Sequence, residues 1–206
     1  MAYYLLSDGV DGRVEVAGAD ISGSDWAVRF RAFSNETVSS DYVQILFNDD
    51  SDLSPALRIS GDGKVSARPS GLNPPFVEVA TGQDFTALKD IELRRVSSVT
   101  TVYVNNVDYG IIGLENLSFG GLMNLFSAHR TSSSSFFSKA AIESFEIEVA
   151  GVVLHSWDAV DFTGTTWTDS VGTNDGTAYG GITKVFYGGG GFQAAWVRRQ
   201  NRIIGA

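Results

Sequence analysis

The chain contains no cysteine, which excludes disulfide bonds, thiolate metal ligands and cysteine nucleophiles. It has only four prolines, so few positions among its 206 residues interrupt a regular backbone. The first ten residues, MAYYLLSDGV, contain no basic leader, and no apolar run is long enough to cross a bilayer. We therefore expect a soluble, unprocessed all-β domain with an appendage, folded by packing alone in a reducing cytoplasm and not bound to a membrane.

Basic residues are also scarce, since the formal net charge is -9. This balance argues against nucleic-acid binding, because affinity for phosphate backbones comes mainly from lysine and arginine. No acidic residue follows Asp175, so residues 176–206 carry only the basic residues Lys184, Arg198, Arg199 and Arg202. The rest of the chain has 24 acidic and 11 basic residues, and the last segment is therefore chemically distinct.

Apolar and polar residues alternate with a period of two along most of the chain, which is typical of strands with one buried face. In residues 26–32 all even-numbered residues are apolar and both arginines are odd-numbered. Two hairpins are expected, one joining 56–60 to 64–68 through Gly61-Asp62-Gly63 and one turning at Ser97-Ser98. Many short strands with glycine-rich turns indicate a β-sandwich or jelly roll.

Four stretches in a fixed order resemble the concanavalin A-like, laminin G-like jelly rolls. They are YLLSDGVDGRVEVAG, VTTVYVNNVDYG, SSSSFFSKAAIESFEIEVAG and HSWDAVDFTGTTWTDSVGTNDGTAYG. The family often has glycine where Lys139-Ala140 stand here. The resemblance implies an all-β, two-sheet antiparallel jelly-roll sandwich over residues 1–180. Residues 181–206 are expected to form a glycine-rich hinge and a basic, apolar C-terminal arm.

The stretch IESFEIEV, residues 142–149, has two interpretations. Its glutamates could be catalytic, because β-glucanases that share this fold carry several acids along one strand face. Strand alternation instead predicts that Glu146 and Glu148 form the solvent side of a strand that buries Phe145, Ile147 and Val149. The same alternation places Glu143 on the other face, so three acids do not converge. We predict no catalytic residue, and a glycoside hydrolase or lyase remains the alternative.

Metal and cofactor sites are not expected. The loop Asn48 to Asp52 gathers side-chain oxygens, but it lacks the spacing of a full calcium loop. His129 and His155 have no neighbouring histidine or cysteine to form a zinc site. The serine run 132–135 is interpreted as a surface loop, and the glycines 188–191 as a hinge.

Exposed aromatic rings can stack on sugars without catalytic acids. By residue type, Trp157, Trp167 and Tyr109 are the candidates for glycan binding, and Tyr187 is a further one. Trp26 alternates in phase with buried positions and is expected in the core.

The C-terminal stretch FQAAWVRRQNRIIGA is apolar and cationic, so it is expected to dock on a partner. The predicted assembly residues are Phe192, Trp196, Arg198, Arg199, Arg202, Ile203 and Ile204. The segment is either a closing strand of its own domain or an arm that packs on a neighbouring subunit. It resembles the C-termini of some structural proteins of tailed bacteriophages.

The combined prediction is a non-enzymatic structural protein of a tailed phage virion, made in the host cytoplasm. It would be a capsid-decorating or accessory protein that forms homo-oligomers and contacts other capsid or tail proteins. Adhesion to cell-surface glycans is an added role, and a carbohydrate-binding module or glycoside hydrolase on the same fold is the alternative.

Overall fold

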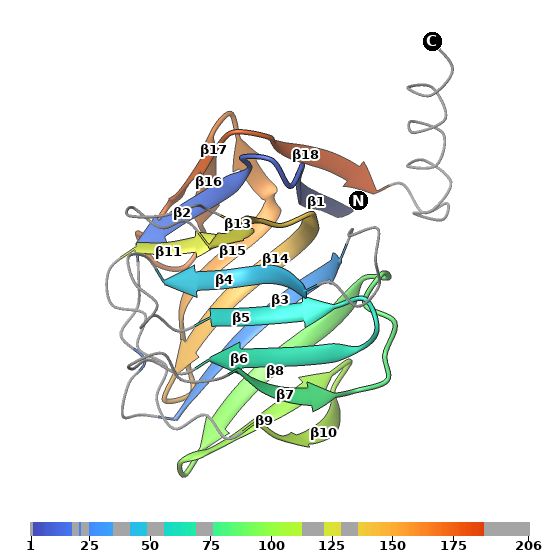
Figure 1. Ribbon diagram of the computed structural model, residues 1–206. Helices are drawn as coiled ribbons and strands as arrows, with labels where there is room; N and C mark the ends of the chain where they lie inside the picture. Colours follow the sequence, from blue (N-terminus) through green and yellow to red (C-terminus); the bar gives the residue numbers. More distant parts are fainter. Residues whose placement is uncertain are drawn as a thin grey trace, which may run out of the picture.

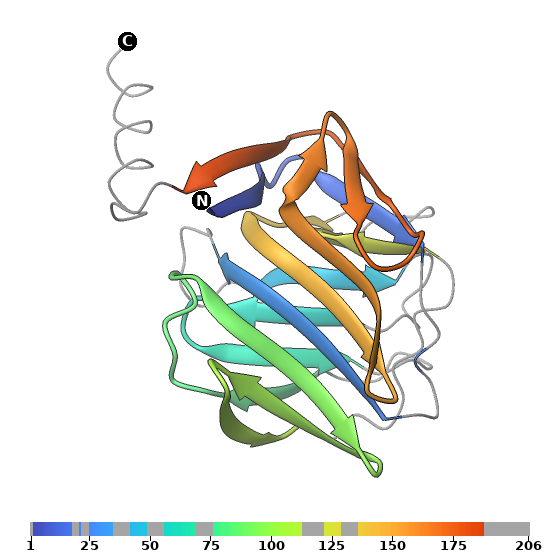
Figure 2. The same cartoon turned by 180° about the vertical axis from the view of Figure 1, so that it is seen from behind.

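The computed structural model describes residues 2–17, 21, 25–34, 42–48, 56–68, 76–112, 122–128 and 136–187. These residues form strands, turns and connecting segments, with no helix among them. The strands pack as two antiparallel layers, which Figures 1 and 2 show from opposite sides. The expected all-β jelly-roll sandwich is therefore confirmed. None of the described residues forms a helix with the length and apolar character that a membrane span requires.

One layer contains, in hydrogen-bonded order, β10 (Val107–Ile111), β9 (Val99–Val104), β8 (Lys89–Val96), β3 (Trp26–Ser34), β14 (Ala140–Val149) and β15 (Val152–Thr163). The other contains β2 (Arg13–Ala17), β11 (Leu122–Leu125), β4 (Tyr42–Asn48), β5 (Ala56–Ser60), β6 (Lys64–Arg68) and β7 (Val77–Ala80). β16 (Thr166–Asp169) and β17 (Gly176–Tyr179) connect the layers, because the hydrogen-bonded path runs from β15 through both of them to β2.

Four further strands complete the described chain. β1 (Ala2–Ser7) pairs with β14 and with β18 (Ile182–Tyr187), which extends the first layer at its upper end in Figure 1. β12 (Ser127–Ala128) and β13 (Phe136–Phe137) form a separate two-stranded ladder.

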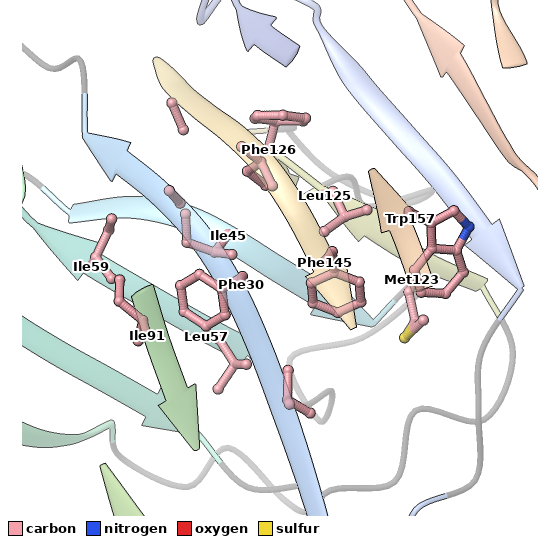
Figure 3. Packing of buried hydrophobic residues seen from close by; sticks show 14 of the residues in the cluster. Phe30, Ile45, Leu57, Ile59, Ile91, Met123, Leu125, Phe126, Phe145 and Trp157 are labelled. Atoms are coloured by element: carbon pink, nitrogen blue, oxygen red, sulfur yellow. The ribbon is translucent and has the colours of Figure 1, made fainter. Parts of the chain in front are cut away.

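The core lies between the two layers and is filled by the inward residues of both. Phe30 and Phe145 from the first layer face the space that Ile45 and Leu57 fill from the second (Figure 3). Trp26 is only 2% exposed, which confirms its expected place in the core. Burial of large apolar side chains from both sheets supplies most of the stabilisation of such a sandwich.

Both predicted hairpins are present. β5 and β6 pair across Gly61-Asp62-Gly63, and β8 and β9 pair across Ser97-Ser98, where both serines have positive φ. Gly63 has a φ of +94°, and a Cβ there would lie 2.5 Å from the carbonyl oxygen of Gln83. Glycine is therefore required at that turn by both conformation and space.

The predicted domain boundary after residue 180 is too early. β18 pairs with β1 over its whole length, from Ile182 opposite Ser7 to Tyr187 opposite Ala2, so these residues belong to the jelly roll. Lys184 also donates hydrogen bonds to the carbonyl oxygens of Val160 and Phe162 at 2.6 and 2.9 Å. The alternation of apolar and polar residues alone does not reveal this strand, because its pairing partner lies at the other end of the chain. Residues 188–206 lie outside the described ranges.

Candidate functional site

The candidate site lies on the outer face of the first layer, where glutamates project from β14. Phe145 and Ile147 are fully buried, and Val149 packs against the same core. Glu146 and Glu148 lie on the opposite side and are about 31% and 24% exposed. The predicted alternation of these five residues is confirmed.

The prediction that Glu143 lies on the other face from these two glutamates is wrong. The pairing of β14 with β3 shifts register between Ile142 and Ser144, so Glu143 is an extra residue in the ladder. Such a bulge changes the phase of the strand and redirects a side chain. The carboxylate of Glu143 consequently lies 3.3 Å from Nη1 of Arg31, whose Nε lies 3.4 Å from Asp90 of β8.

Arg29 lies at the centre of the ion pairs on this face. Its Nη1 contacts Glu146 at 2.6 Å and Glu148 at 2.7 Å, and its Nε lies 3.3 Å from Glu92. Strand register explains the arrangement, because Arg29 stands directly opposite Glu146 of β14 and Glu92 of β8. Cross-strand pairs of opposite charge are the natural neighbours on one face of an antiparallel sheet.

Arg94 extends the network along β8. It binds Glu92 through two hydrogen bonds, from Nε to Oε1 at 2.7 Å and from Nη2 to Oε2 at 3.0 Å. Its guanidinium also lies over the ring of Tyr103 in β9, at 5.1 Å from the ring centroid. Tyr103 is half-buried and keeps part of its ring accessible.

Most of these side chains line a cleft of about 360 Å³, which we call the charged cleft; Glu143 and Glu148 are not part of its lining. Its polar lining residues are Arg29, Arg31, Asp90, Glu92, Arg94, Tyr103, Asn106, Ser144, Glu146 and Ser156. The lining thus combines guanidinium, carboxylate, amide and hydroxyl groups with one accessible aromatic ring. A cleft of this composition offers both hydrogen-bond donors and acceptors to a polyhydroxylated ligand.

Two ionisable side chains of this network have shifted pKa values. Burial alone would lower the pKa of Arg29, but its hydrogen bonds to Glu148 and Glu146 and the charge of Glu92 outweigh burial and raise that pKa. Burial raises the pKa of Glu143; Arg31 opposes this rise, whereas Asp158 and Asp90 add to it. Carboxylates thus determine the shift at Arg29, and burial is the main cause of the shift at Glu143.

The structure corrects the predicted glycan-binding tryptophans. Trp157 and Trp167 are both 0% exposed, so neither ring can stack on a sugar. Their indole N–H groups are satisfied internally, by the carbonyl oxygens of Asn174 at 3.0 Å and Asp158 at 2.7 Å. Their burial could not be read from residue type alone, because tryptophan is common both in cores and at sugar sites.

Of the two tyrosine candidates for glycan binding, the structure describes the side chain of Tyr109 only. Tyr109 is half-buried in β10, its hydroxyl accepts a hydrogen bond from Nε2 of Gln83 at 2.8 Å, and it does not line the charged cleft. Tyr187 ends β18, and its side chain is outside the described part of the structure.

The stretch TDSVGTNDGT, residues 168–177, forms a structural loop around Asp169. The fully buried carboxylate of Asp169 accepts hydrogen bonds from the amides of Ser156, Val171, Gly172 and Asn174 at 2.9 to 3.2 Å. Burial alone would raise the pKa of Asp169, but these amides and His155, whose Nδ1 lies 2.7 Å away, lower it to about 2.

The glycines of this loop are needed for close packing. A Cβ at Gly172 would lie 2.5 Å from both Asp169 and His155, and one at Gly176 would lie 2.8 Å from Val16 of β2. Asp175 accepts the amide hydrogen bond of Asp169 at 2.9 Å. The motif therefore closes the connection between the layers, a role that its sequence did not reveal.

Several predicted features lie outside the described residues. These are His129, the residues after Asn48 in the loop Asn48 to Asp52, the serine run 132–135 and the assembly residues 192–204. Across the ranges that are described, no group of three or more histidine, cysteine, aspartate and glutamate residues is placed to hold a metal ion.

Sequence patterns did not identify Arg29, Glu92, Arg94 and Tyr103 as members of a site. A signal was present, since the alternation in residues 26–32 places Arg29 on the outer face. The carboxylates that Arg29 meets depend on the register of β3 with β14 and β8, which join segments far apart in the chain.

No protein family model and no curated protein sequence matches the chain. Solved structures do match. A putative carbohydrate binding protein from Bacteroides ovatus has a TM-score of 0.62 and 11% identity over 89% of this chain. This chain spans only 60% of the length of that protein.

Two further neighbours have the same architecture. The heptameric SAP-like pentraxin from Limulus polyphemus has a TM-score of 0.51 and 9% identity, covering 71% of this chain and 75% of its own. Domains LG4-5 of the mouse laminin alpha1 chain have a TM-score of 0.50 and 10% identity, covering 72% and 41%. At these identities the likeness shows the fold alone, and it confirms the resemblance to concanavalin A-like and laminin G-like jelly rolls.

Proposed function

We propose that the protein is a non-catalytic glycan-binding domain and that the charged cleft is its binding site. The observation that carries the proposal is the cleft itself, about 360 Å³ in volume, with guanidinium, carboxylate and hydroxyl groups beside the accessible ring of Tyr103. Sugar hydroxyls pair with such groups, and the apolar face of a pyranose stacks on an aromatic ring. The fold supports the proposal, because the Bacteroides neighbour is described as a putative carbohydrate binding protein.

A catalytic role is the second candidate function of the same glutamates. Glycoside hydrolysis needs one protonated and one ionised carboxyl group placed on either side of the scissile bond. Glu146 and Glu148 instead share one nitrogen of Arg29, so both lie on the same side of the cleft rather than on either side of a bound sugar. Glu143 has a raised pKa but is paired with Arg31. This arrangement suits binding better than proton transfer.

Replacement of Tyr103 by alanine is expected to weaken glycan binding by about fivefold, because a stacking contact of about 1 kcal/mol is lost. A glycan array identifies the ligand, and isothermal titration of the wild type and the variant measures the change. Tyr109→Ala is the matched control, since Tyr109 is also half-buried but lies outside the charged cleft.

Equal loss of binding in both tyrosine variants, or no loss in Tyr103→Ala, would contradict the assignment of the cleft. Release of reducing ends from the bound glycan, abolished by Glu143→Gln, would instead establish the protein as a hydrolase.

We further propose that residues 192–206 join this domain to neighbouring subunits, as in a phage virion. One feature favours this assembly role: a small apolar cluster that is separate from the main core. Tyr4, Phe33 and Ala141 are its buried members, and Leu6, Leu88 and Val185 are its partly exposed members. Val185 belongs to β18, which ends at Tyr187 and is separated from the proposed arm by residues 188–191. The partly exposed members offer an apolar surface where the arm of an adjacent copy can pack.

Deletion of residues 192–206 is expected to leave a folded domain, because β18 and its pairing with β1 are retained. The truncated chain should lose its self-association, measured by light scattering after size exclusion. Leu88→Asp should have the same effect, whereas Val107→Asp, at an exposed apolar position on β10, should not.

The salt dependence of association separates the electrostatic contribution to assembly from the apolar one. Arg198→Glu with Arg199→Glu should weaken association in a salt-dependent way, and Trp196→Ala should weaken it at any salt. If the truncated chain fails to fold, residues 192–206 are part of the domain itself, and the arm proposal is wrong.

A further inference from the structure

The charged cleft and its immediate ion pairs contain more acidic than basic side chains. The acidic members are Asp90, Glu92, Glu143, Glu146 and Glu148, and the basic members are Arg29, Arg31 and Arg94. The set therefore has five carboxylates and three guanidiniums. Two negative charges have no cationic counterpart within it, which leaves a net negative site.

The hydrogen bonds of this network also leave acceptors available. Glu146 uses Oε1 and Glu148 uses Oε2 to bind the same nitrogen of Arg29. A carboxylate oxygen can accept more than one hydrogen bond, so both glutamates keep acceptor capacity beside Arg29. Arg29 contacts three carboxylates, so its positive charge is already largely compensated before a ligand anion could approach.

The pKa of Arg29 agrees with this charge count. It is raised although the side chain is partly buried, because Glu148, Glu146 and Glu92 stabilise the charged guanidinium. A positive ligand group would relieve the repulsion among the carboxylates, whereas a negative group would increase it.

We infer that the charged cleft selects amino sugars with a protonated amine over neutral sugars, and that it rejects sugars bearing a carboxylate. This inference rests on the proposed glycan-binding function and adds the charge class of the ligand. The ammonium group would be placed beside Glu146 in the cleft, with Glu143 and Glu148 adding to the negative charge around it and the sugar ring toward Tyr103. Neutral hydroxyls can still pair with the same groups, so neutral sugars are weaker ligands rather than excluded ones.

Three tetrasaccharides with one linkage provide the test: β-1,4-linked glucosamine, glucose and glucuronate. Each is titrated into the full chain at about pH 6, where the amine of glucosamine is protonated. We expect the glucosamine oligomer to bind at least about fivefold more tightly than the glucose oligomer, and the glucuronate oligomer not to bind. Added salt should weaken the first interaction and leave the second unchanged.

Charge-matched variants localise the effect. Glu146→Gln, at a residue that lines the cleft, should reduce glucosamine affinity about fivefold and leave glucose affinity nearly unchanged. Asp161→Asn removes the same charge from an exposed position outside the cleft lining and should change neither affinity. This control matters because a protein with a net charge of -9 attracts polycations non-specifically.

The outcomes separate the inference from the function on which it rests. Equal affinity for the three oligomers, preference for glucuronate, or equal effects of Glu146→Gln and Asp161→Asn would overturn the inference and leave glycan binding intact. Failure of all three oligomers, together with a glycan array that is negative throughout, would overturn the inference and the proposed function together.

Discussion

Replacement of Trp157 by alanine is expected to lower the free energy of unfolding by about 3–5 kcal/mol, a large part of the total stability of a domain. The indole is fully buried, lies 5.5 Å from the ring of Phe145 and 6.4 Å from that of Trp167, and donates its N–H to Asn174. Removal of this side chain leaves a cavity between the layers and an unpaired carbonyl group. Urea denaturation followed by circular dichroism measures the loss.

Two further variants make this test specific. Trp157→Phe keeps most of the apolar volume but not the N–H donor, so its stability should lie between those of the wild type and the alanine variant. Tyr109→Ala, at a half-buried tyrosine, should cost less than Trp157→Ala. A Trp157→Ala protein with wild-type stability and impaired sugar binding would restore Trp157 as a surface residue and contradict its burial.

The second large effect is expected at Asp169. Asp169→Asn keeps the shape of the side chain but turns an amide NH₂ toward backbone N–H donors, so about 2–4 kcal/mol of stability should be lost at neutral pH. The carboxylate accepts hydrogen bonds from His155 and from the amides of the loop that follows, including those of Gly172 and Asn174. Denaturant unfolding at pH 7 measures the difference from the wild type.

The pH dependence of this difference identifies the charge as its cause. The pKa of Asp169 falls from its ordinary value of 3.8 to about 2 on folding. Because the folded pKa lies below the unfolded one, the stabilisation is complete above about pH 5 and disappears as the pH falls toward 2. The stability gap between wild type and Asp169→Asn should therefore shrink by about 2 kcal/mol between pH 7 and pH 2.

Asp161→Asn serves as the control for this titration, because Asp161 is exposed and should show little difference from the wild type at either pH. If the stability difference between wild type and Asp169→Asn stays constant from pH 7 to pH 2, the hydrogen bonds of Asp169 stabilise the loop through shape rather than charge.

The sequence alone determined the fold class, because alternation with a period of two reports which face of a strand is buried. Alternation assigns Phe145 and Ile147 to the core and Glu146 to the outer face, and the structure confirms all three positions. The hairpins at Gly61-Asp62-Gly63 and Ser97-Ser98 could also be predicted from the sequence, since their turn residues and flanking strands are adjacent in the chain.

Only the tertiary structure decided what depends on pairing between distant segments. The bulge that brings Glu143 to the outer face exists in the register of β14 against β3, and alternation extended without a break places this residue on the wrong side. Trp157 could not be assigned to core or surface by type, because its burial requires both layers and the loop of Asn174. β18 pairs with β1, so the end of the domain is set by a strand near the start of the chain. Local pattern fixes which way a side chain points along a regular strand, and long-range register then fixes which side chains meet and form a site.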